Sequence, residues 1–388
     1  MAVNFVQPAP ACKAIAFHLP QFHPIPENDL WWGKGFTEWT NVTRAVPQFP
    51  GHWQPHLPAD MGFYDLRVAE VREEQARLAR RYGIHGFCYY HYWLHGKRLL
   101  ELPVNEILRT GRPDFPFCLC WANHNWTRNW DDGTEALFIE QRYSMADHLD
   151  HIRWLCKVFL DERYIRIDGK PLFLIFRAQA IHYLRDMVDM WREQAKLLGV
   201  GELFLAEVEA QRVEERGDPR ERGLDAVVEF QPDFHTLHDL DSQELSPELE
   251  KTRQRGHHVF TYNDMVERMR AKSVPSYPYF RCVTPSWDNT ARRRSKGIIV
   301  HGSTPESYAG WLASVLREGN QAGTSEPMVF LNAWNEWAEG NHLEPCQRWG
   351  HRYLQATSRA LRGIANQEGV AAAPNGQEVP NEAQEVAA

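Results

Sequence analysis

The stretch KAIAFHLPQFHP, residues 13–24, decides the fold class. Its first five residues form a mostly apolar run, typical of a strand buried on both faces. HLPQFHP follows at the place where a dinucleotide-binding fold would put a glycine-rich turn. Neither G-x-G-x-x-G nor G-x-x-x-x-G-K-[ST] occurs elsewhere in the chain. These features argue against a doubly wound nucleotide-binding sheet and favour a barrel of parallel strands.

Similar short apolar runs alternate with helical patterns along the whole chain. We expect strands at 13–17, 86–90, 116–121, 172–176, 203–208, 226–230, 280–284 and 329–334. Helices are expected at 66–81, 145–159, 181–198, 249–270, 307–317 and 348–360. Eight strands in β-then-α order predict an α/β fold, a (β/α)8 TIM barrel.

The barrel is expected to be a single domain over residues 13–362. An N-terminal extension at 1–12 precedes it, and a tail at 363–388, rich in Ala, Glu, Pro and Asn, is expected to be disordered. The segments 18–64 and 124–144 are too long for simple βα loops. We expect them to be ordered loops over the catalytic face.

Composition narrows the function classes. The 388 residues include 43 Lys and Arg against 51 Asp and Glu, and the formal net charge is −8. This argues against binding to nucleic acid or to an anionic membrane, which require a basic face. Aromatic residues reach 12%, which suits stacking on sugar rings but also suits a large core.

The cell compartment is predicted from the start of the chain and from its cysteines. The first residues lack the basic and apolar pattern of a secretory signal, and no run of eighteen apolar residues occurs. The seven cysteines are scattered, without a C-x-x-C motif. We expect a reduced, cytoplasmic protein with no membrane span.

Polar and aromatic residues follow every predicted strand. In a (β/α)8 barrel the carboxyl ends of the strands carry the site. We therefore expect substrate contacts from His18, Gln21, Tyr90, His91, Trp93, Trp121, Asn123, His124, Trp126, Arg177, Glu207, Trp287, Asp288, Asn335 and Trp337.

The stretch LNAWNEWAEG at 331–340 places two carboxylates, Glu336 and Glu339, at the end of the last strand. If the chain turns helically there, the two Cβ atoms lie about 5–6 Å apart. Retaining glycosidases separate their carboxyl groups by roughly 5–5.5 Å. Neighbouring charges and indole rings would raise one pKa, which creates an acid beside a base. Alternatively, Glu339 only caps or solvates the eighth helix.

Other charged features have plainer interpretations. Arg177 and Glu207 form an internal ion pair in one alternative. DLD at 239–241 and DD at 131–132 have the acidic pattern of metal-dependent glycosyltransferases, but such pairs are common in an acidic chain. The basic run at 292–294 is interpreted as a solvated loop, with contact to a phosphate or an acidic sugar as the alternative.

Metal chemistry is not expected from this sequence. His52 and His56 are four residues apart, as are His91 and His95, but neither pair has a helical context or a third ligand. Trp130 is a further candidate sugar platform beside the tryptophans already named. We predict no metal and no cofactor.

Seven motifs together carry a resemblance to a known family. They are FHLPQFHP at 17–24, WWGKGFTEWTNV at 31–42, GHWQPHLP at 51–58, GIHGFCYYHYW at 83–93, CWANHNW at 120–126, GKP at 169–171 and NAWNEWAEG at 332–340. Over about 13–362 the chain resembles the WbsX-type domain of polysaccharide biosynthesis proteins, which is related to the family 99 glycoside hydrolases, the endo-α-mannosidases. The resemblance implies a (β/α)8 barrel that acts on glycans through a 1,2-anhydrosugar. It also implies that Glu336 accepts the proton of the sugar 2-hydroxyl and that Glu339 is the acid and then the base.

The expected function is that of a retaining endo-glycoside hydrolase acting on an oligo- or polysaccharide. A glycosyltransferase of O-antigen or other cell-surface polysaccharide biosynthesis, with a nucleotide-sugar or lipid-linked donor, is the main alternative. A glycan-binding barrel without catalysis is the third.

Overall fold

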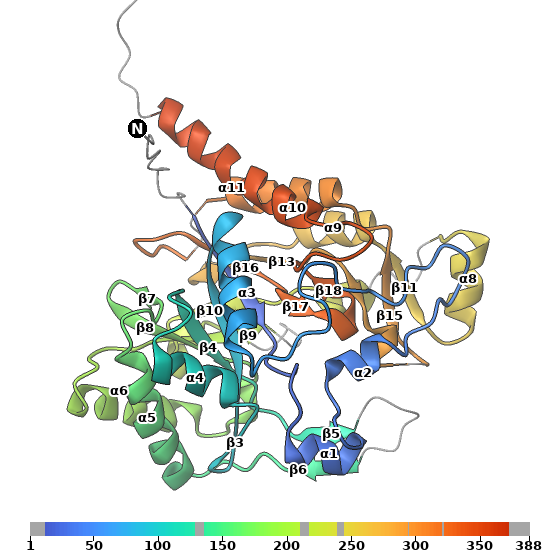
Figure 1. Cartoon of the computed structure of the whole chain (residues 1–388). Coiled ribbons are helices and arrows are strands. Elements are labelled where there is room, and N and C mark those ends of the chain that lie inside the picture. Colours follow the sequence, from blue (N-terminus) through green and yellow to red (C-terminus); the bar gives the residue numbers. More distant parts are fainter. Residues whose placement is uncertain are drawn as a thin grey trace, which may run out of the picture.

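The computed structural model describes residues 12–128, 136–209, 217–238, 244–293, 295–319 and 322–371. Its main sheet is a ring of parallel strands (Figure 1). The ring strands are β1 (Lys13–His18), β2 (Ile84–Leu94), β4 (Phe117–Trp121), β8 (Lys170–Ile175), β9 (Phe204–Glu209), β10 (Ala226–Glu229), β12 (Tyr279–Phe280), β13 (Cys282–Val283) and β16 (Met328–Leu331). The predicted barrel is confirmed.

The seventh position of the ring is split. β12 pairs with β10, and β13 pairs with β16, so the single strand expected at 280–284 is interrupted at Arg281. The strands run in the same direction, and the ends of β4 and β8 pair with each other and with β2 near its end, since His91 pairs with Trp121 and Trp121 with Ile175. The residues that follow each strand therefore meet at one end of the barrel, as side chains that form a site must.

Helices cover the outside of the ring. They are α3 (Ala69–Arg81), α4 (Leu102–Thr110), α5 (Met145–Phe159), α6 (Leu184–Leu197), α9 (Tyr262–Arg270), α10 (Pro305–Arg317) and α11 (Arg352–Ala371). Side chains cap the start of three of these helices: Ser144 accepts the amide of Asp147 at α5, Thr261 caps α9, and Thr304 forms a capping box at α10. α10 and α11 lie side by side (Figure 1).

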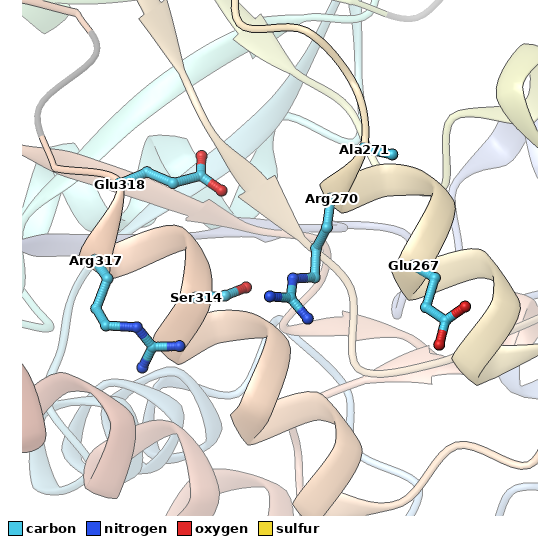
Figure 2. Close-up of a pocket in the computed structure, with 6 residues that line it drawn as sticks. All are labelled: Glu267, Arg270, Ala271, Ser314, Arg317 and Glu318. Atoms are coloured by element: carbon cyan, nitrogen blue, oxygen red, sulfur yellow. The ribbon is translucent and has the colours of Figure 1, made fainter.

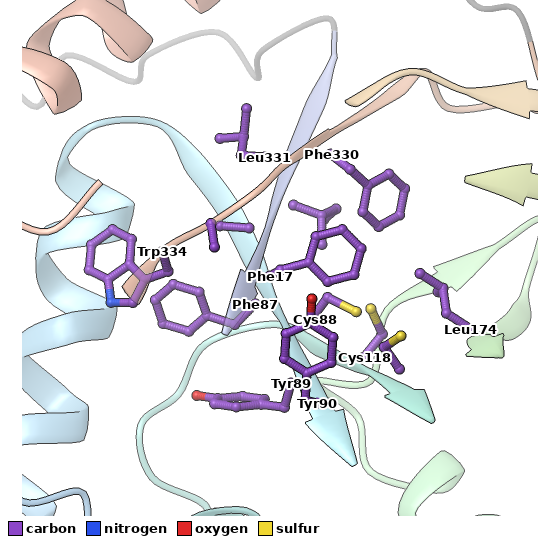
Figure 3. Packing of buried hydrophobic residues seen from close by; sticks show 14 of the residues in the cluster. Phe17, Phe87, Cys88, Tyr89, Tyr90, Cys118, Leu174, Phe330, Leu331 and Trp334 are labelled. Carbon is purple, nitrogen blue, oxygen red and sulfur yellow. The ribbon is translucent and has the colours of Figure 1, made fainter. Parts of the chain in front are cut away.

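Aromatic and aliphatic side chains fill the inside of the barrel. Phe17 stacks on Tyr90 and packs on Phe330, with ring centroids 5.7 Å apart in both pairs. Figure 3 shows these rings beside Leu174 and the thiols of the neighbouring strands. Six of the seven cysteines are buried thiols outside any disulfide, so they pack as small apolar side chains.

The predicted helix at 249–270 is wrong. α8 (Pro247–Gln254) ends before Gly256, which has φ +98°, a left-handed conformation that suits glycine. β11 (His258–Thr261) follows and pairs with β15 (Ile298–His301), which also pairs with β14 (Trp287–Asp288). This small second sheet, with α8 outside it, lies on the side of the barrel away from α5 and α6 (Figure 1).

The two long segments after the first and third strands contain short elements. Residues 18–64 include α1 (Pro26–Trp32) and α2 (Glu38–Val42), and β5 (Trp126–Arg128) pairs with β6 (Ala136–Ile139). β3 (Lys97–Leu99) pairs with β2, and β7 (Arg166–Ile167) with β8. α7 (Phe234–His238) follows β10.

Some expectations concern parts of the chain at or beyond the limits of this description. α11 continues to Ala371, past residue 362, where a disordered tail was expected to begin. Most of the predicted extension 1–12, the tail beyond 371, Trp130 and the acidic pairs at 131–132 and 239–241 lie outside the described residues. Within the described ranges, no helix has the length and apolarity needed to cross a membrane.

Candidate functional site

A cleft of ≈ 410 Å³ opens at the carboxyl ends of the ring strands. Aromatic side chains form much of its wall, and arginines and glutamates provide its charges. The residues that line it are Leu19, Gln21, Trp32, Tyr90, Tyr92, Ala122, His124, Asn125, Trp126, Thr127, Phe176, Arg177, Phe230, Phe234, Trp287, Asn289, Arg292, Arg293, Ile298, Glu336 and Glu339.

A tight turn after β16 presents both glutamates to this cleft. Glu336 ends β17 (Asn335–Glu336), Glu339 ends the 3₁₀ turn η4 (Trp337–Glu339), and β18 (Asn341–His342) pairs back with β17. Residues three apart lie one above the other in a 3₁₀ turn, as the predicted helical spacing required. Gly340 closes the turn with φ +57°, and a Cβ there would lie 2.9 Å from Cβ of Asp288. Only glycine fits this close approach.

One guanidinium joins three carboxylates beneath the cleft. Arg292 donates from Nη1 to Glu339 at 2.5 Å, from Nη2 to Glu336 at 2.9 Å and from Nε to Glu38 at 3.1 Å. Glu38 is completely buried, and its Oε1 has no hydrogen-bond partner. Because Arg292 binds both catalytic candidates at once, their carboxyl groups converge on one point.

Burial controls the protonation of this cluster. It raises the pKa of Glu336 to about 8, against the effect of Arg292 and with the help of the neighbouring charges of Glu339 and Glu38. Burial likewise raises the pKa of Glu339. The three carboxylates together raise the pKa of Arg292, although burial opposes them. Three acids around one cation therefore favour a bound proton near neutral pH.

Six of the expected substrate contacts line the cleft with the glutamates: Gln21, Tyr90, His124, Trp126, Arg177 and Trp287. They come from five different strand ends. Trp126 lies edge-on to Tyr92 at 5.0 Å, and Trp287 lies edge-on to Phe234 at 5.1 Å. The cleft therefore offers aromatic rings and hydrogen-bonding groups together.

Four other expected contacts project to the outside of the barrel and do not line the cleft. Side chains alternate along a strand, so Tyr90 and Tyr92 face the cleft while His91 and Trp93 pack on α5. Their partners there include Trp154, which stacks on His91, and Asp147, which accepts from Trp93. Trp121 and Glu207 are also buried outside the cleft wall.

The alternative interpretation paired Glu207 with Arg177. In the structure Glu207 forms its ion pair with Arg222 instead. Trp121 packs edge-on against His151 at 4.7 Å. Both side chains are thus part of the outer packing of the barrel.

Five more expected contacts support the site from behind. His18 binds Gln75, and burial lowers its pKa to about 3. Asn335 binds both backbone groups of Leu19. Trp337 stacks on His342 at 3.7 Å. These buried groups hold loops in place.

The last two of the five are Asn123 and Asp288. Asn123 binds the backbone amide and carbonyl of Arg177. Asp288 lies 2.5 Å from His52 and accepts from Thr290. These five residues and the four that face outward do not line the cleft, so direct contact with a substrate there is not expected of them.

Several residues that complete the site were not predicted from the sequence. Arg292 was interpreted as part of a solvated loop, but its side chain is largely buried among carboxylates. Glu38 lies within the WWGKGFTEWTNV motif, which was the one available signal for it. Tyr92 lines the cleft two residues after Tyr90 on β2, and Phe176 and Phe230 line it directly after β8 and β10.

Glu344 forms a second buried acid network beneath the turn. It accepts from Tyr64 at 2.8 Å, from Trp337 at 2.6 Å and from Gln75 at 2.7 Å. Burial nevertheless raises its pKa to about 7, because three hydrogen bonds only partly offset the loss of water.

Glu344→Gln is therefore expected to change how stability depends on pH. The folded protein holds this proton more tightly than the unfolded chain, so wild-type stability falls as pH rises from about 4.5 through about 7. The Gln variant lacks this ionisation. The difference in unfolding free energy between the two should shift in favour of the variant by on the order of 3 kcal/mol between pH 4 and pH 8. Urea unfolding at several pH values measures it, and parallel curves would contradict the assignment.

Besides this cleft, the described part of the chain has one cavity apart from it and a smaller one that shares Trp287 with it. One of ≈ 470 Å³ lies between the outer helices α9 and α10, is lined by Glu267, Arg270, Ser314 and their neighbours, and shares no residue with the cleft (Figure 2). The other, of ≈ 190 Å³, lies beside Asp288 and His52. Among the described residues, no three His, Cys, Asp or Glu side chains converge as metal ligands.

Comparison with known proteins matches residues 14–357 to the family described as Glycosyltransferase WbsX. The uncharacterized protein WxcX of Xanthomonas campestris pv. campestris (strain B100) is 43% identical over 350 residues, which are 89% of this chain and 49% of that protein. The chain thus spans about half the length of the curated relatives it matches.

Two solved structures are similar in fold. The GH99 endo-α-mannosidase from Bacteroides thetaiotaomicron has a TM-score of 0.52 at 15% identity, over 92% of this chain and 98% of that one. A glycoside hydrolase-like protein has a TM-score of 0.55 at 16% identity, over 90% and 94%.

Proposed function

Because the chain belongs to the WbsX glycosyltransferase family, a group of carbohydrate-active enzymes, we propose that it cleaves a glycosidic bond with retention of configuration, using Glu336 and Glu339. One observation carries this proposal: both carboxylates line the cleft and both bind Arg292. Two carboxyl groups that flank the scissile bond are what retaining hydrolysis requires. We further propose that cleavage is internal to an oligo- or polysaccharide.

The first step forms a 1,2-anhydrosugar. Glu336 takes the proton of the 2-hydroxyl, the 2-oxygen bonds to C1, and the bond from C1 to the leaving oxygen breaks while Glu339 protonates that oxygen. In the second step Glu339 takes a proton from water, whose oxygen attacks C1. The bond from C1 to the 2-oxygen breaks, and Glu336 returns its proton to that oxygen. C1 is inverted twice, so its configuration is retained.

This chemistry requires one proton on the glutamate pair. Burial raises the pKa of both groups, Glu336 to about 8, so loss of the shared proton should stop turnover on the alkaline side. We expect a bell-shaped profile of kcat/KM with its alkaline limb near pH 8, the two limbs belonging to the pair rather than to either residue. Initial rates from pH 4 to pH 10 measure it. An alkaline limb two or more pH units away would contradict the assignment.

The activity itself is tested by screening mannose-, rhamnose- and fucose-containing polysaccharides for new reducing ends. Release of oligosaccharides supports internal cleavage, whereas release of single sugars only would contradict it. The family name favours a second candidate, transfer from an activated donor. Calorimetry with nucleoside diphosphates, with and without Mn²⁺, separates the two, because tight metal-dependent binding together with no hydrolysis favours transfer.

A further inference from the structure

The two glutamates of the cleft and the arginine Arg177 come from opposite sides of the barrel. Glu336 and Glu339 follow β16, and Arg177 follows β8. In the ring order, β1, β2 and β4 separate these strands on one side, and the split seventh strand, β10 and β9 separate them on the other. β8 and β16 are therefore diametrically opposed, yet the side chains after both line the same cleft.

Arg177 is held firmly at its backbone. Its N–H donates to Oδ1 of Asn123 at 2.7 Å, and its carbonyl accepts from Nδ2 of the same residue at 2.9 Å. Asn123 is fully buried and also binds the hydroxyl of Tyr143 at 3.0 Å. The guanidinium therefore projects into the cleft from a fixed point and not from a free loop.

Like Arg72, whose Nη1 donates to the carbonyl of Leu66, Arg177 lacks the carboxylate partner that three other largely buried arginines of the described ranges have. Arg281 pairs with Glu229 and Glu318, Arg163 pairs with Asp161, and Arg292 has its three glutamates. The guanidinium of Arg177 has no carboxylate within ion-pair distance among the described residues, and its buried Nε makes no hydrogen bond. Burial lowers its pKa, as expected for a cation that has lost water without gaining an acid.

His124 adds a second unused group at the same place. It lines the cleft, its Nδ1 is buried without a hydrogen-bond partner, and its ring packs 6.1 Å from Phe176. Burial and the charge of Arg177 lower its pKa to about 4. At neutral pH it is therefore an uncharged hydrogen-bonding group beside a cation.

We propose that Arg177 and His124 form a subsite for an anionic group of the substrate, on the side of the cleft opposite the glutamate pair. A desolvated guanidinium without a partner is costly, and a carboxylate or phosphate would offset that cost with paired, charge-assisted hydrogen bonds. The position also keeps the anion far from Glu336 and Glu339, which would repel it. This inference rests on the proposed function and makes the substrate an acidic glycan, charged away from the reacting bond.

Arg292 and Arg293, the described part of the basic run at 292–294, act on the glutamates, whereas contact with a phosphate or an acidic sugar was the alternative expectation. Arg292 already neutralises three carboxylates, so it is not available to an anionic sugar. Arg293 also lines the cleft, and its charge lowers the pKa of Glu339. Arg177 lines the same cleft without a carboxylate partner among the described side chains, so an anion of the substrate is expected there.

Calorimetry on the Glu339→Gln background tests the subsite without turnover. The probes are oligogalacturonides, for a carboxylate, and mannose 6-phosphate, for a phosphate, each compared with its neutral counterpart. Adding Arg177→Gln should weaken binding of the preferred acidic probe by about 10- to 100-fold and leave the neutral probes unchanged. Arg185→Gln, which removes an exposed arginine on α6, is the matched control and should change neither.

The comparison of the two acidic probes identifies the anion, and the Arg177→Gln variant tests the subsite. Tighter binding of the uronate or of the phosphate identifies the source of the anion. If the Arg177→Gln substitution weakens the binding of neither acidic probe, the subsite is wrong, whether or not Glu339 proves essential for turnover. Arg177→Gln should also keep or raise the melting temperature, because it removes an uncompensated cation; a large fall would indicate a structural role and contradict the proposal.

Discussion

Glu339→Gln is expected to reduce kcat by about 10²- to 10⁴-fold, because general acid–base catalysis by one residue contributes that much. The amide keeps the size of the side chain and can still accept from Arg292, so the turn η4 should persist. It cannot protonate the leaving oxygen or take a proton from water. Initial rates on the best polysaccharide of the screen, with calorimetry for binding, measure both effects.

Glu306→Gln is the matched control for this experiment. Glu306 is exposed in the first turn of α10 and does not line the cleft. Its variant should retain full activity. If the Glu339→Gln variant turns over substrate as fast as the wild type, Glu339 is not the acid and base of the reaction. If the variant loses binding as well as turnover, its site is misfolded.

Arg292→Gln is expected to have the largest effect on stability. It leaves Glu38, Glu336 and Glu339 buried around a neutral amide. Removing one partner of a buried ion pair typically costs about 3–5 kcal/mol. Because Arg292 lowers the pKa of both catalytic candidates, its loss should also move the pH profile of any remaining activity to higher pH.

Arg292→Lys separates charge from geometry. An ammonium keeps the charge but lacks the planar fork that reaches three carboxylates at once. We expect partial recovery of the unfolding free energy measured in urea, and a pH profile closer to that of the wild type. If the wild type and the Arg292→Gln variant have equal unfolding free energies, Arg292 does not stabilise the three buried carboxylates as described.

The strands of the barrel could be predicted because each is a short apolar run bounded by polar residues. The helix expected at 249–270 failed for a local reason. Its two halves both show helical spacing, but Gly256 and the β-prone HVFT stretch separate them into α8, β11 and α9. A single periodicity over a long window does not register such an interruption.

The residues of the site were harder to predict than the strand ends that carry them. In YYHYW at 89–93, inward and outward positions are equally aromatic, so composition could not tell Tyr92 from His91. Glu38 and Arg292 come together across 254 positions of sequence. Only the almost closed ring of strands makes them neighbours, and no local pattern records that.

The proposed chemistry depends most on the action of Glu336 and Glu339 on one sugar ring through its 2-hydroxyl. The most direct test compares turnover of the identified substrate with that of its 2-deoxy analogue. Removing the hydroxyl eases formation of a cationic sugar but leaves nothing to form the 1,2-anhydrosugar. We predict that the analogue binds and is not cleaved, and cleavage at a rate equal to or above that of the parent substrate would contradict the proposed mechanism.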